Sequence, residues 1–293
     1  MAKTKEISRR IKSVANIKKI TKAMEMVAAA KMRRAIEAVL RTRTYANLSW
    51  ETVVHLAALA EQNKEARHPL LEQRTETKKV AVVLITSNRG MCGGYNSAVI
   101  AKAESSVHKH SLPTEFILAG RKGGVVAARG YEVAAEFEKA DIVTDAKDIA
   151  PLTRLAIDNY LSGKYDKVFV AYTDFVNAAK QVPRVKQLLP VQVDKEDEYL
   201  GIVGEGSPAV VSREMIGEKE KKHLGINGAT FEYIFEPDTG TVLDQMIPRL
   251  IETQLYQAYL ESNASEHSAR MTAMHQATDA ANDVVSELTL FYN

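Results

Sequence analysis

Glycine and proline are absent from both ends of this sequence, and that absence constrains the fold more than any motif does. All 15 glycines and all 8 prolines lie between Pro69 and Pro248. In a helix interior glycine costs roughly 1 kcal/mol and proline roughly 3 kcal/mol, so both are typical of the places where elements end. Their exclusion from residues 1–68 and 249–293 predicts one very long helix at each end of the chain, flanking a middle of shorter elements.

Apolar residues at both ends recur at helical intervals. In the first segment they take nine steps between Ile7 and Val39, about 3.6 residues per step, and in the last a seam takes eight steps of 3.5 residues from Ala264 to Tyr292. Such long helices cannot bury their stripes alone, so we expect an antiparallel coiled coil. The predicted seams are Ile7, Ile11, Val14, Ile17, Ile20, Met24, Ala28, Met32, Ile36 and Val39 in the first helix, and Ala264, His267, Met271, Met274, Thr278, Ala281, Val285, Leu288 and Tyr292 in the last.

Charge is divided between the two ends. Residues 1–43 contain 13 Lys and Arg against three Glu, whereas residues 242–293 contain seven acidic residues against two Arg. The opposite signs favour packing of one helix on the other, although single surface ion pairs contribute little. The positive surplus of the first helix is left for another partner, while the net charge of the whole chain, +2, does not indicate a polyanion partner.

Several residue types exclude other classes of protein. Cys92 is the only cysteine, so no intrachain disulfide forms, and we interpret it as a small apolar residue beside a strand in a reducing compartment. We interpret His267 and His275 as imidazoles on the helix surface, because no Cys or third His stands at metal-ligand spacing. No apolar run approaches the ~18 residues of a membrane-spanning helix, and the start lacks the apolar core of a signal peptide.

Residues 69–238 are predicted to form an α/β domain inserted between helices 1–68 and 239–293. From residue 78 onward short apolar runs alternate with amphipathic stretches, which is typical of β-α-β units and a largely parallel sheet. We interpret residues 194–227 as loops. The predicted strands are Val80–Ile85, Glu115–Leu118, Glu132–Phe137, Val168–Tyr172, Arg184–Leu189 and Thr230–Phe235, and the predicted helices are Ser97–His108, Arg121–Ala128 and Asp145–Leu161.

A glycine-rich turn after the first predicted strand raises the question of nucleotide binding. The segment KKVAVVLITSNRGMCGGYN runs from Lys78 to Asn96, and a strand, a glycine loop and a helix together hold the phosphate in many nucleotide-binding proteins. The spacing, however, is G-x-x-G-G rather than G-x-G-x-x-G, and no lysine and hydroxyl follow the last glycine. We interpret the loop as a turn that needs positive φ angles.

No catalytic constellation is evident in the middle of the chain. It contains no H-E-x-x-H, no C-x-x-C and no nucleophile with a base nearby in sequence. Asp166, Asp174 and Lys180 border predicted strand ends, where ligands of open α/β sheets bind, and we interpret them as ordinary solvated charges. The sequence therefore predicts no catalytic residue, no metal site and no bound cofactor.

Three segments together resemble the γ subunit of the bacterial F-type ATP synthase. They are ISRRIKSVANIKKITKAMEMVAAAKMRRA from Ile7 to Ala35, ITSNRGMCGGYN from Ile85 to Asn96, and ASEHSARMTAMHQATDAA from Ala264 to Ala281, followed by LTLFYN. The resemblance covers essentially the whole chain in the right order. It implies a central rotor stalk, present once per complex, whose paired helices stand inside a ring of α and β subunits. It also implies a Rossmann-like domain at the foot, beside the ε subunit and the c-ring, on the cytoplasmic face of the inner membrane.

The resemblance further implies a role and a set of contact residues. The stalk transmits torque between the ion-driven c-ring and the ring of α and β subunits, and no nucleotide need bind its glycine loop. Because a rotating shaft must not adhere to its ring at one angle, we expect a basic outer surface with small residues rather than deep apolar side chains. The residues expected to meet β-subunit loops are Met24, Lys31, Arg33 and Arg34 on the first helix, and Glu266, Arg270, Gln276 and Thr278 on the last.

Two departures and two alternative functions remain. Family members usually continue past the L-T-x-x-Y-N segment, so we expect the chain to assemble with a looser contact between the far end of the shaft and the surrounding ring. The redox cysteine pair of chloroplast members does not occur here. The basic first helix also fits a coiled-coil nucleic-acid-binding protein, although the acidic last helix offers it an intramolecular partner. The middle also fits a nucleotide-binding α/β enzyme.

Overall fold

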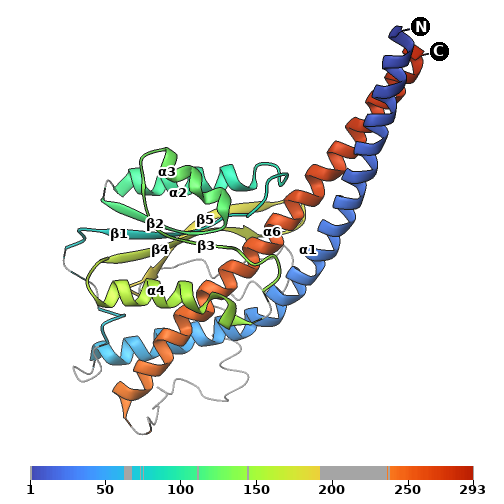
Figure 1. The fold of residues 1–293 in the computed structure, drawn as a ribbon. Coiled ribbons are helices and arrows are strands. Elements are labelled where there is room, and N and C mark those ends of the chain that lie inside the picture. The colour runs from blue at the N-terminus through green and yellow to red at the C-terminus, as the bar shows by residue number, and fades with distance from the viewer. Residues whose placement is uncertain are drawn as a thin grey trace.

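A computed structural model shows a long two-helix shaft with an α/β domain attached to one side (Figure 1). It describes residues 2–62, 68–72, 74, 76–110, 112–143, 145–191, 236 and 238–292. Helix α1 spans Ala2–Gln62 and helix α6 spans Thr239–Tyr292, with lengths of 61 and 54 residues. At about 1.5 Å per residue, α1 would extend about 90 Å if straight. The long helices expected from the distribution of glycine and proline are confirmed.

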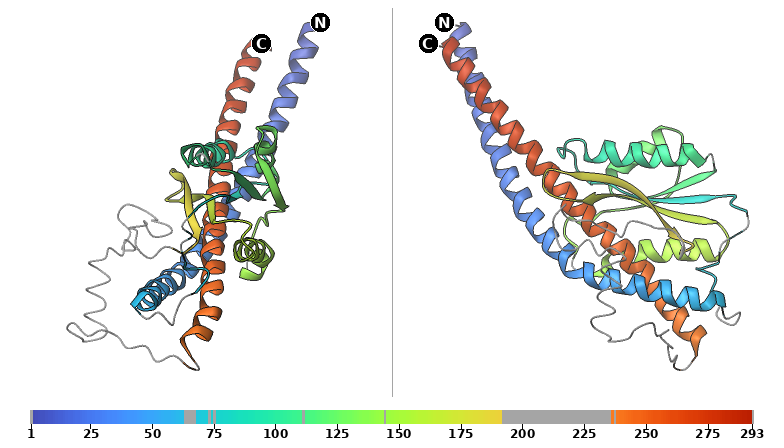
Figure 2. Two further views of the ribbon diagram at one scale, coloured as in Figure 1. Left: turned by 90° about the vertical axis from the view of Figure 1, so that its left-hand side faces the viewer. Right: turned by 180° about the vertical axis from the view of Figure 1, so that it is seen from behind.

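The two long helices pack antiparallel. The hydroxyl oxygens of Thr21 and Thr278 are 2.8 Å apart, and farther from the tip Thr42 Oγ1 donates a hydrogen bond to Gln257 Oε1 at 2.7 Å. Residue numbers therefore increase along α1 in the direction in which they decrease along α6. Both ends of the chain lie together at the tip of the shaft (Figure 2). The predicted antiparallel coiled coil is confirmed.

The buried face of α1 differs in part from the predicted seam. Ile17 and Ile20 are 50% and 59% exposed, whereas Thr21 is buried. The residues that face the partner helix advance by heptads, because two helices that wind around each other stay in contact at every 3.5 residues rather than every 3.6. The heptad series of buried or half-buried residues is Ile7, Val14, Thr21, Ala28, Ala35 and Thr42. Ile20 lies one position before Thr21 of this series, and Ile17 lies between Val14 and Thr21, outside the series.

The seam of α6 follows the prediction closely. Ala264, His267, Met274, Thr278 and Ala281 are buried, and Met271, Val285 and Leu288 are half-buried. The final predicted member, Tyr292, is 46% exposed. The prediction therefore holds along most of the helix and is wrong only at its last residue, where the shaft ends.

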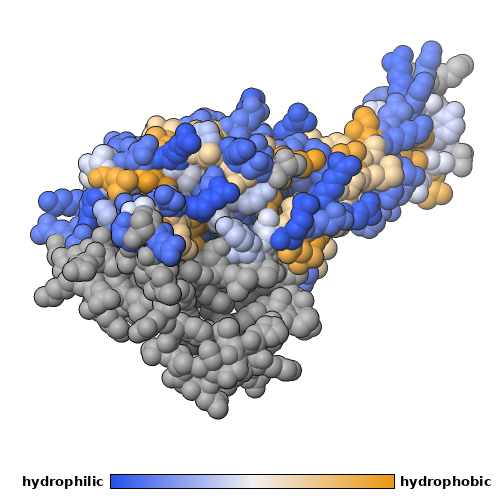
Figure 3. Space-filling view, turned by 90° about the horizontal axis from the view of Figure 1, so that it is seen from below, coloured by the Kyte–Doolittle hydropathy of each residue, from blue (hydrophilic) through white to orange (hydrophobic). Residues whose placement is uncertain are grey.

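The outer surface of the shaft is less uniform than expected. Hydrophilic side chains dominate the tip, but apolar ones appear among them (Figure 3). Met26 and Val27 are more than half exposed, as are Ile20 and Leu40. The expectation of an outer surface without large apolar side chains is therefore wrong for the middle of α1, because residues that miss the heptad seam have no partner helix to cover them.

The domain contains a five-stranded sheet with helices on both faces. Its elements follow the predicted alternation, and residues 194–227 and 230–235 lie outside the described part of the chain. The strands are β1 (Val80–Ile85), β2 (Thr114–Ala119), β3 (Glu132–Phe137), β4 (Lys167–Phe175) and β5 (Gln181–Leu189). The helices are α2 (Tyr95–His110), the 3-10 turn η1 (Arg121–Gly124), α3 (Val125–Ala128), η2 (Ala146–Ile149) and α4 (Ala150–Leu161).

The strand order is β3-β2-β1-β4-β5. Strands β1 to β4 are parallel and β5 is antiparallel to β4, so the sheet is largely parallel as predicted. The first four strands have the 3-2-1-4 order of dinucleotide-binding domains. The order reverses between β1 and β4, which makes that boundary the place where such domains bind ligands.

Two apolar layers hold the domain together. Val80, Val82 and Leu84 of β1 pack against α2 with Val99 and Ile100, while Ala81, Val83 and Ile85 face α4 and α6. The alternation follows from the two-residue period of a strand. Both faces of β1 are thus covered, which explains its continuous apolar sequence. In Figure 1 α2 and α3 lie on one side of the sheet and α4 on the other.

Candidate functional site

Helix α6 crosses the carboxyl edge of the parallel sheet. Ser265 Oγ donates a hydrogen bond to the Thr173 carbonyl oxygen of β4 at 3.1 Å, and the hydroxyls of Tyr95 and Ser262 are hydrogen-bonded to each other. Open α/β sheets bind their ligands at this edge, at the point where the strand order reverses. Here α6 lies at that point, so the chain itself contacts the edge that would otherwise receive a ligand.

The glycine loop after β1 uses its polar groups within the protein. The Ser87 amide donates to Asn96 Oδ1 at 2.9 Å. Arg270 of α6 donates to the carbonyl oxygens of Arg89 and Gly90, at 3.3 and 3.4 Å. Gly93 has a φ of +55°, which confirms the interpretation of a turn that needs positive φ angles. These contacts attach the loop to the shaft.

A buried ion pair joins the domain to α6. Lys139, which follows β3, places its Nζ 2.7 Å from Glu266 Oε2, and Arg270 Nη1 lies 2.8 Å from Glu266 Oε1. The side chains of Lys139 and Glu266 are only 2% and 5% exposed. The Lys139 ammonium also lies over the rings of Tyr95 and Tyr259, 5.4 and 5.9 Å from their centroids. The rings and the carboxylate together surround the ammonium.

The ion pair is charged at neutral pH. Burial alone would lower the pKa of Lys139, but the charge of Glu266 and its hydrogen bond outweigh burial and raise the pKa. Burial would raise the pKa of Glu266, but Lys139 and Arg270 lower it. Burial also raises the pKa of Tyr259 to about 12, so this phenol stays neutral. Two opposite charges that are out of water hold each other in a defined geometry.

Three consecutive residues, Lys139, Ala140 and Asp141, connect the domain with both long helices, and we call them the wedge loop. The Ala140 amide donates to the hydroxyl oxygen of Tyr259 at 2.9 Å. The carbonyl oxygen of Asp141 lies 3.1 Å from His267 Nε2. The Asp141 carboxylate accepts a hydrogen bond from Lys31 Nζ of α1 at 2.7 Å, and this contact lowers its pKa.

Asn88 of the glycine loop holds the wedge loop in place from the domain side. Its Nδ2 donates to the Lys139 carbonyl oxygen at 2.6 Å, and its Oδ1 accepts from the Lys139 amide at 3.1 Å. One side chain therefore satisfies both backbone groups of a buried residue. Sequence reasoning missed Asn88 and Lys139, because a charged residue after a strand and a polar one before a glycine both resemble solvated loop residues.

The predicted contact residues of α1 lie on its accessible surface to different degrees. Arg33 and Arg34 are exposed, and Met24 is half-buried. Lys31 is also half-buried, and its ammonium is paired with Asp141. Arg33 and Arg34 thus present charge outward, while Lys31 serves the contact between the shaft and the domain.

The predicted contact residues of α6 are divided between the inside and the outside. Gln276 is exposed, and the Arg270 side chain is 14% exposed. Glu266 is buried with both carboxylate oxygens bound within the chain, and Thr278 is buried with its hydroxyl against Thr21. In this structure Glu266 and Thr278 do not present their polar atoms to a partner.

Three other interpretations require correction. His267 is buried rather than on the helix surface, and burial lowers its pKa; His275 is exposed as expected. Asp174 is buried and lies 2.8 Å from Arg184 Nε, and Asp166 is mostly buried and accepts a hydrogen bond from Arg74. Both aspartates organise strand ends because a carboxylate inside the domain needs donors.

Cys92 is buried beside the end of β1, as the interpretation of a small apolar residue expects, and Lys180 is exposed as a solvated charge. In the described part of the chain no group of three or more His, Cys, Asp or Glu side chains has a metal-binding arrangement. Within the same ranges, no helix combines the length and the apolar character needed to cross a membrane.

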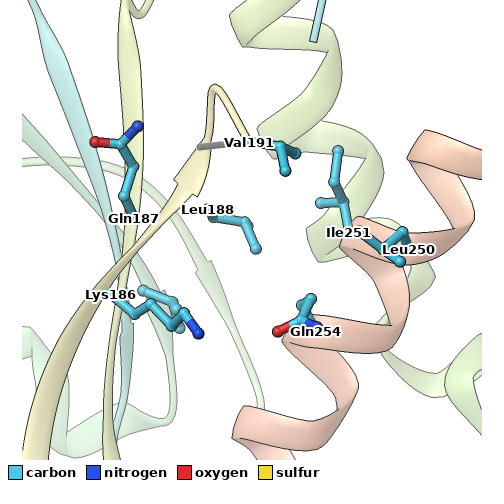
Figure 4. Close-up of a pocket in the computed structure, with 8 residues that line it drawn as sticks. Lys186, Gln187, Leu188, Val191, Leu250, Ile251 and Gln254 are labelled. Carbon is cyan, nitrogen blue, oxygen red and sulfur yellow. The ribbon is translucent and has the colours of Figure 1, made fainter. Parts of the chain in front are cut away.

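Two hollows in the described part of the chain lie away from the glycine loop. One lies between β5 and α6 and encloses about 10 Å³, the space of roughly one water. Figure 4 shows Leu188, Val191 and Ile251 around it, with Lys186 and Gln254 at its margin. A wider hollow, lined by Lys79 and Tyr131 among others, lies at the amino ends of the strands, opposite the glycine loop.

The fold, and the contact between the long helices and the domain, which we call the junction, define a class of proteins. In this class an antiparallel two-helix shaft carries an α/β domain on its side. Residues 3–293 match the family described as ATP synthase, and curated ATP synthase gamma chains are similar over the full length of this chain. The chain belongs to the family of ATP synthase gamma chains.

Two relatives show how close the similarity is. The ATP synthase gamma chain of Dehalococcoides mccartyi strain CBDB1 is 40% identical over 294 residues, which cover 100% of this chain and 92% of the relative. The gamma chain of Symbiobacterium thermophilum is 42% identical over 292 residues, which cover 99% and 90%.

Solved structures share the fold at lower identity. A chain from the central stalk and c-ring structure of the Tetrahymena thermophila mitochondrial ATP synthase superposes with a TM-score of 0.60 and 22% identity, covering 88% of this chain and 99% of that one. A chain from the rotor of the Euglena gracilis mitochondrial enzyme superposes with a TM-score of 0.59 and 15% identity, covering 100% and 96%. The expected shaft with an inserted α/β domain is therefore confirmed.

Proposed function

We propose that this chain is the central rotor stalk of an F-type ATP synthase, and that it transmits torque between the ion-driven c-ring and the catalytic ring of α and β subunits. The observation that carries the proposal is the continuous antiparallel shaft, whose tip extends beyond the α/β domain (Figure 1). An extension of paired helices is stiff along its length and offers a surface to a surrounding ring. The membership of the gamma-chain family supports the same role.

The stalk itself performs no chemistry in this proposal. The carboxyl edge of the sheet, where a nucleotide would bind, is contacted by α6 through Ser262 and Ser265. The partners are the α, β and ε subunits and the c-ring, with one stalk per complex. The stalk stands at the cytoplasmic face of the inner membrane as a peripheral component and binds no nucleic acid or cofactor.

The accessible members of the predicted contact set remain part of the proposal. They are Met24, Arg33 and Arg34 on α1 and Gln276 on α6, while Arg270 reaches the surface only in part. The charges of Arg33 and Arg34 would meet acidic loops of the β subunits through attraction that salt screens. The half-exposed Lys31 adds positive charge near them.

Co-purification tests the assembly. The tagged chain, expressed with its own complex, is expected to retain α, β and ε subunits in a 3:3:1 ratio to itself. Isolation of the chain free of these subunits under conditions that keep the ring intact would refute the proposal. The alternatives give different results: a nucleotide-binding enzyme would bind ATP or NAD in a calorimetric titration, and a nucleic-acid-binding protein would bind duplex DNA with steep salt dependence.

A double variant tests the contact surface. R33A/R34A is expected to lower ATP-driven ion pumping by the complex, because it removes two exposed positive charges that face the ring. The matched control is K102A, which removes an exposed charge from α2 on the domain. Equal pumping by the two variants would remove Arg33 and Arg34 from the proposed contact set.

A further inference from the structure

We propose that the wedge loop, residues Lys139–Asp141, is the element that carries torque between the α/β domain and the two-helix shaft. The proposal rests on the proposed function, since only a rotating stalk needs such an element. It assigns Lys139 and Asp141 as positioning residues, which fix the angle of the domain around the shaft and touch no substrate.

The first requirement of a torque-carrying element is a rigid attachment to the domain. Asn88 accepts from the backbone amide of Lys139 and donates to its carbonyl oxygen, so the loop cannot shift without breaking both bonds. Asn88 itself directly follows Ser87, which is held by Asn96 at the start of α2. The wedge loop is thus bonded to the strand-to-helix turn at the centre of the sheet.

The second requirement is a contact with the shaft that resists sliding. Apolar surfaces slide past each other at little cost, because the area removed from water is nearly unchanged. The Lys139–Glu266 pair behaves differently, since its atoms are 2.7 Å apart and both side chains are almost fully buried. A small rotation of α6 would separate two charges that have no water to compensate them.

The third requirement is a contact with both helices, because α1 could shift relative to a domain that is fixed to α6 alone when torque is applied. The Asp141 carboxylate binds Lys31 of α1, and its carbonyl oxygen contacts His267 of α6. Three adjacent residues therefore reach the two helices from one side of the shaft. Forces applied there act at a distance from the shaft axis, which is the condition for a turning moment.

Two variants test the proposal without removing the core of the junction. K139M replaces the ammonium with an apolar side chain and leaves Glu266 paired with Arg270, so the chain is expected to fold. D141N removes the charge that binds Lys31 at a position that is half exposed. The matched control is R129Q, which breaks the ion pair of Arg129 with Glu104 inside the domain.

The first measurement is amide hydrogen exchange of the complex. K139M is expected to speed exchange in α6 residues 259–268 by about tenfold to a hundredfold, because a buried charge contact is lost. R129Q is expected to leave that segment unchanged. This measurement establishes that the contact is made, and equal protection of the segment in K139M and the unaltered chain would overturn the proposal.

The second measurement reports torque, which a merely structural role would not alter. A bead is attached to the α/β domain while the ring of α and β subunits is immobilised and rotation is paused, and the angular fluctuations of the bead give the torsional stiffness. K139M and D141N are expected to widen the fluctuations, and R129Q to leave them unchanged. Unchanged stiffness in both variants would overturn the proposal.

The proposed function fails in a different way. If complexes lacking this chain pump ions on ATP hydrolysis as well as complete complexes do, the rotor function itself is refuted. If complete complexes need the chain but K139M and D141N keep normal stiffness, only the role of the wedge loop is refuted. The two failures are thus separated by one comparison.

Discussion

Asn88 provides the sharpest test of whether the glycine loop serves structure or ligand binding. N88A removes one donor and one acceptor, and leaves the amide and carbonyl groups of the buried Lys139 without their partner. Each unsatisfied buried group costs about 1–3 kcal/mol. Because Asn88 itself is only half-buried and water replaces part of the loss, we expect a total destabilisation of about 2–4 kcal/mol.

The assay is urea unfolding of the full chain, followed by near-ultraviolet circular dichroism of its tyrosines, two of which lie at the junction. N88D is the matched variant, since its carboxylate accepts from the Lys139 amide but cannot donate to the carbonyl. We expect N88D to lie between N88A and the unaltered chain. A change below about 0.5 kcal/mol for N88A, the range of ordinary surface substitutions, would refute the reasoning.

Three further predictions concern the sheet and the shaft. G120A is expected to destabilise the chain by more than about 2 kcal/mol in the same assay, because φ is +108° and a Cβ would lie 2.3 Å from a backbone oxygen; a change below 1 kcal/mol would contradict this. Burial would raise the pKa of Glu115, but hydrogen bonds from two lysines and a tyrosine lower it from 4.5 to about 2. The folded-state pKa is depressed, so the stability that the unaltered chain has over E115Q is present above pH 4.5 and is expected to disappear between pH 4.5 and about 2; a pH-independent difference would disprove the assignment. The I17S/I20S double variant is expected to change thermal stability little, whereas A28L overfills the seam and costs about 1–3 kcal/mol; the reverse order would show that the heptad assignment is wrong.

Local signals allowed most of the elements to be predicted from the sequence. The two long helices were visible because glycine and proline are confined to the middle, although α6 begins at Thr239 and includes Gly240 and Pro248. The buried strand β1 was visible as an unbroken apolar run. These features depend on neighbours along the chain, which a single sequence contains.

Features that depend on contacts across the chain were harder to predict. The 3-2-1-4 strand order and the antiparallel direction of β5 leave no local trace. Ile17 and Ile20 were placed in the seam because hydropathy favoured them, but the position of the partner helix selects Thr21, whose hydroxyl meets Thr278. A register set by supercoil geometry outweighed hydrophobicity over one stretch of the helix.

The junction was the least predictable part. A polar segment such as Ser262 to Ser268 is ordinarily read as a solvated helix face, yet it is buried throughout. Ser265 and His267 of this segment are satisfied by backbone carbonyls of the sheet edge and the wedge loop, which come from distant parts of the sequence. Burial of Lys139 and Glu266 depends on each being present, so neither residue alone carries the signal.

The polar burial of α6 also has a consequence for exchange of parts between relatives. Its hydroxyls, carboxylate and imidazole fit one particular set of carbonyls and amides on the sheet edge. A helix with an apolar buried face, by contrast, can pack against many different apolar surfaces. A hybrid that takes this helix from one species and residues 86–96 and 138–141 from another combines halves that were never matched. Recombination in this family is therefore expected to succeed only when the three segments are inherited together.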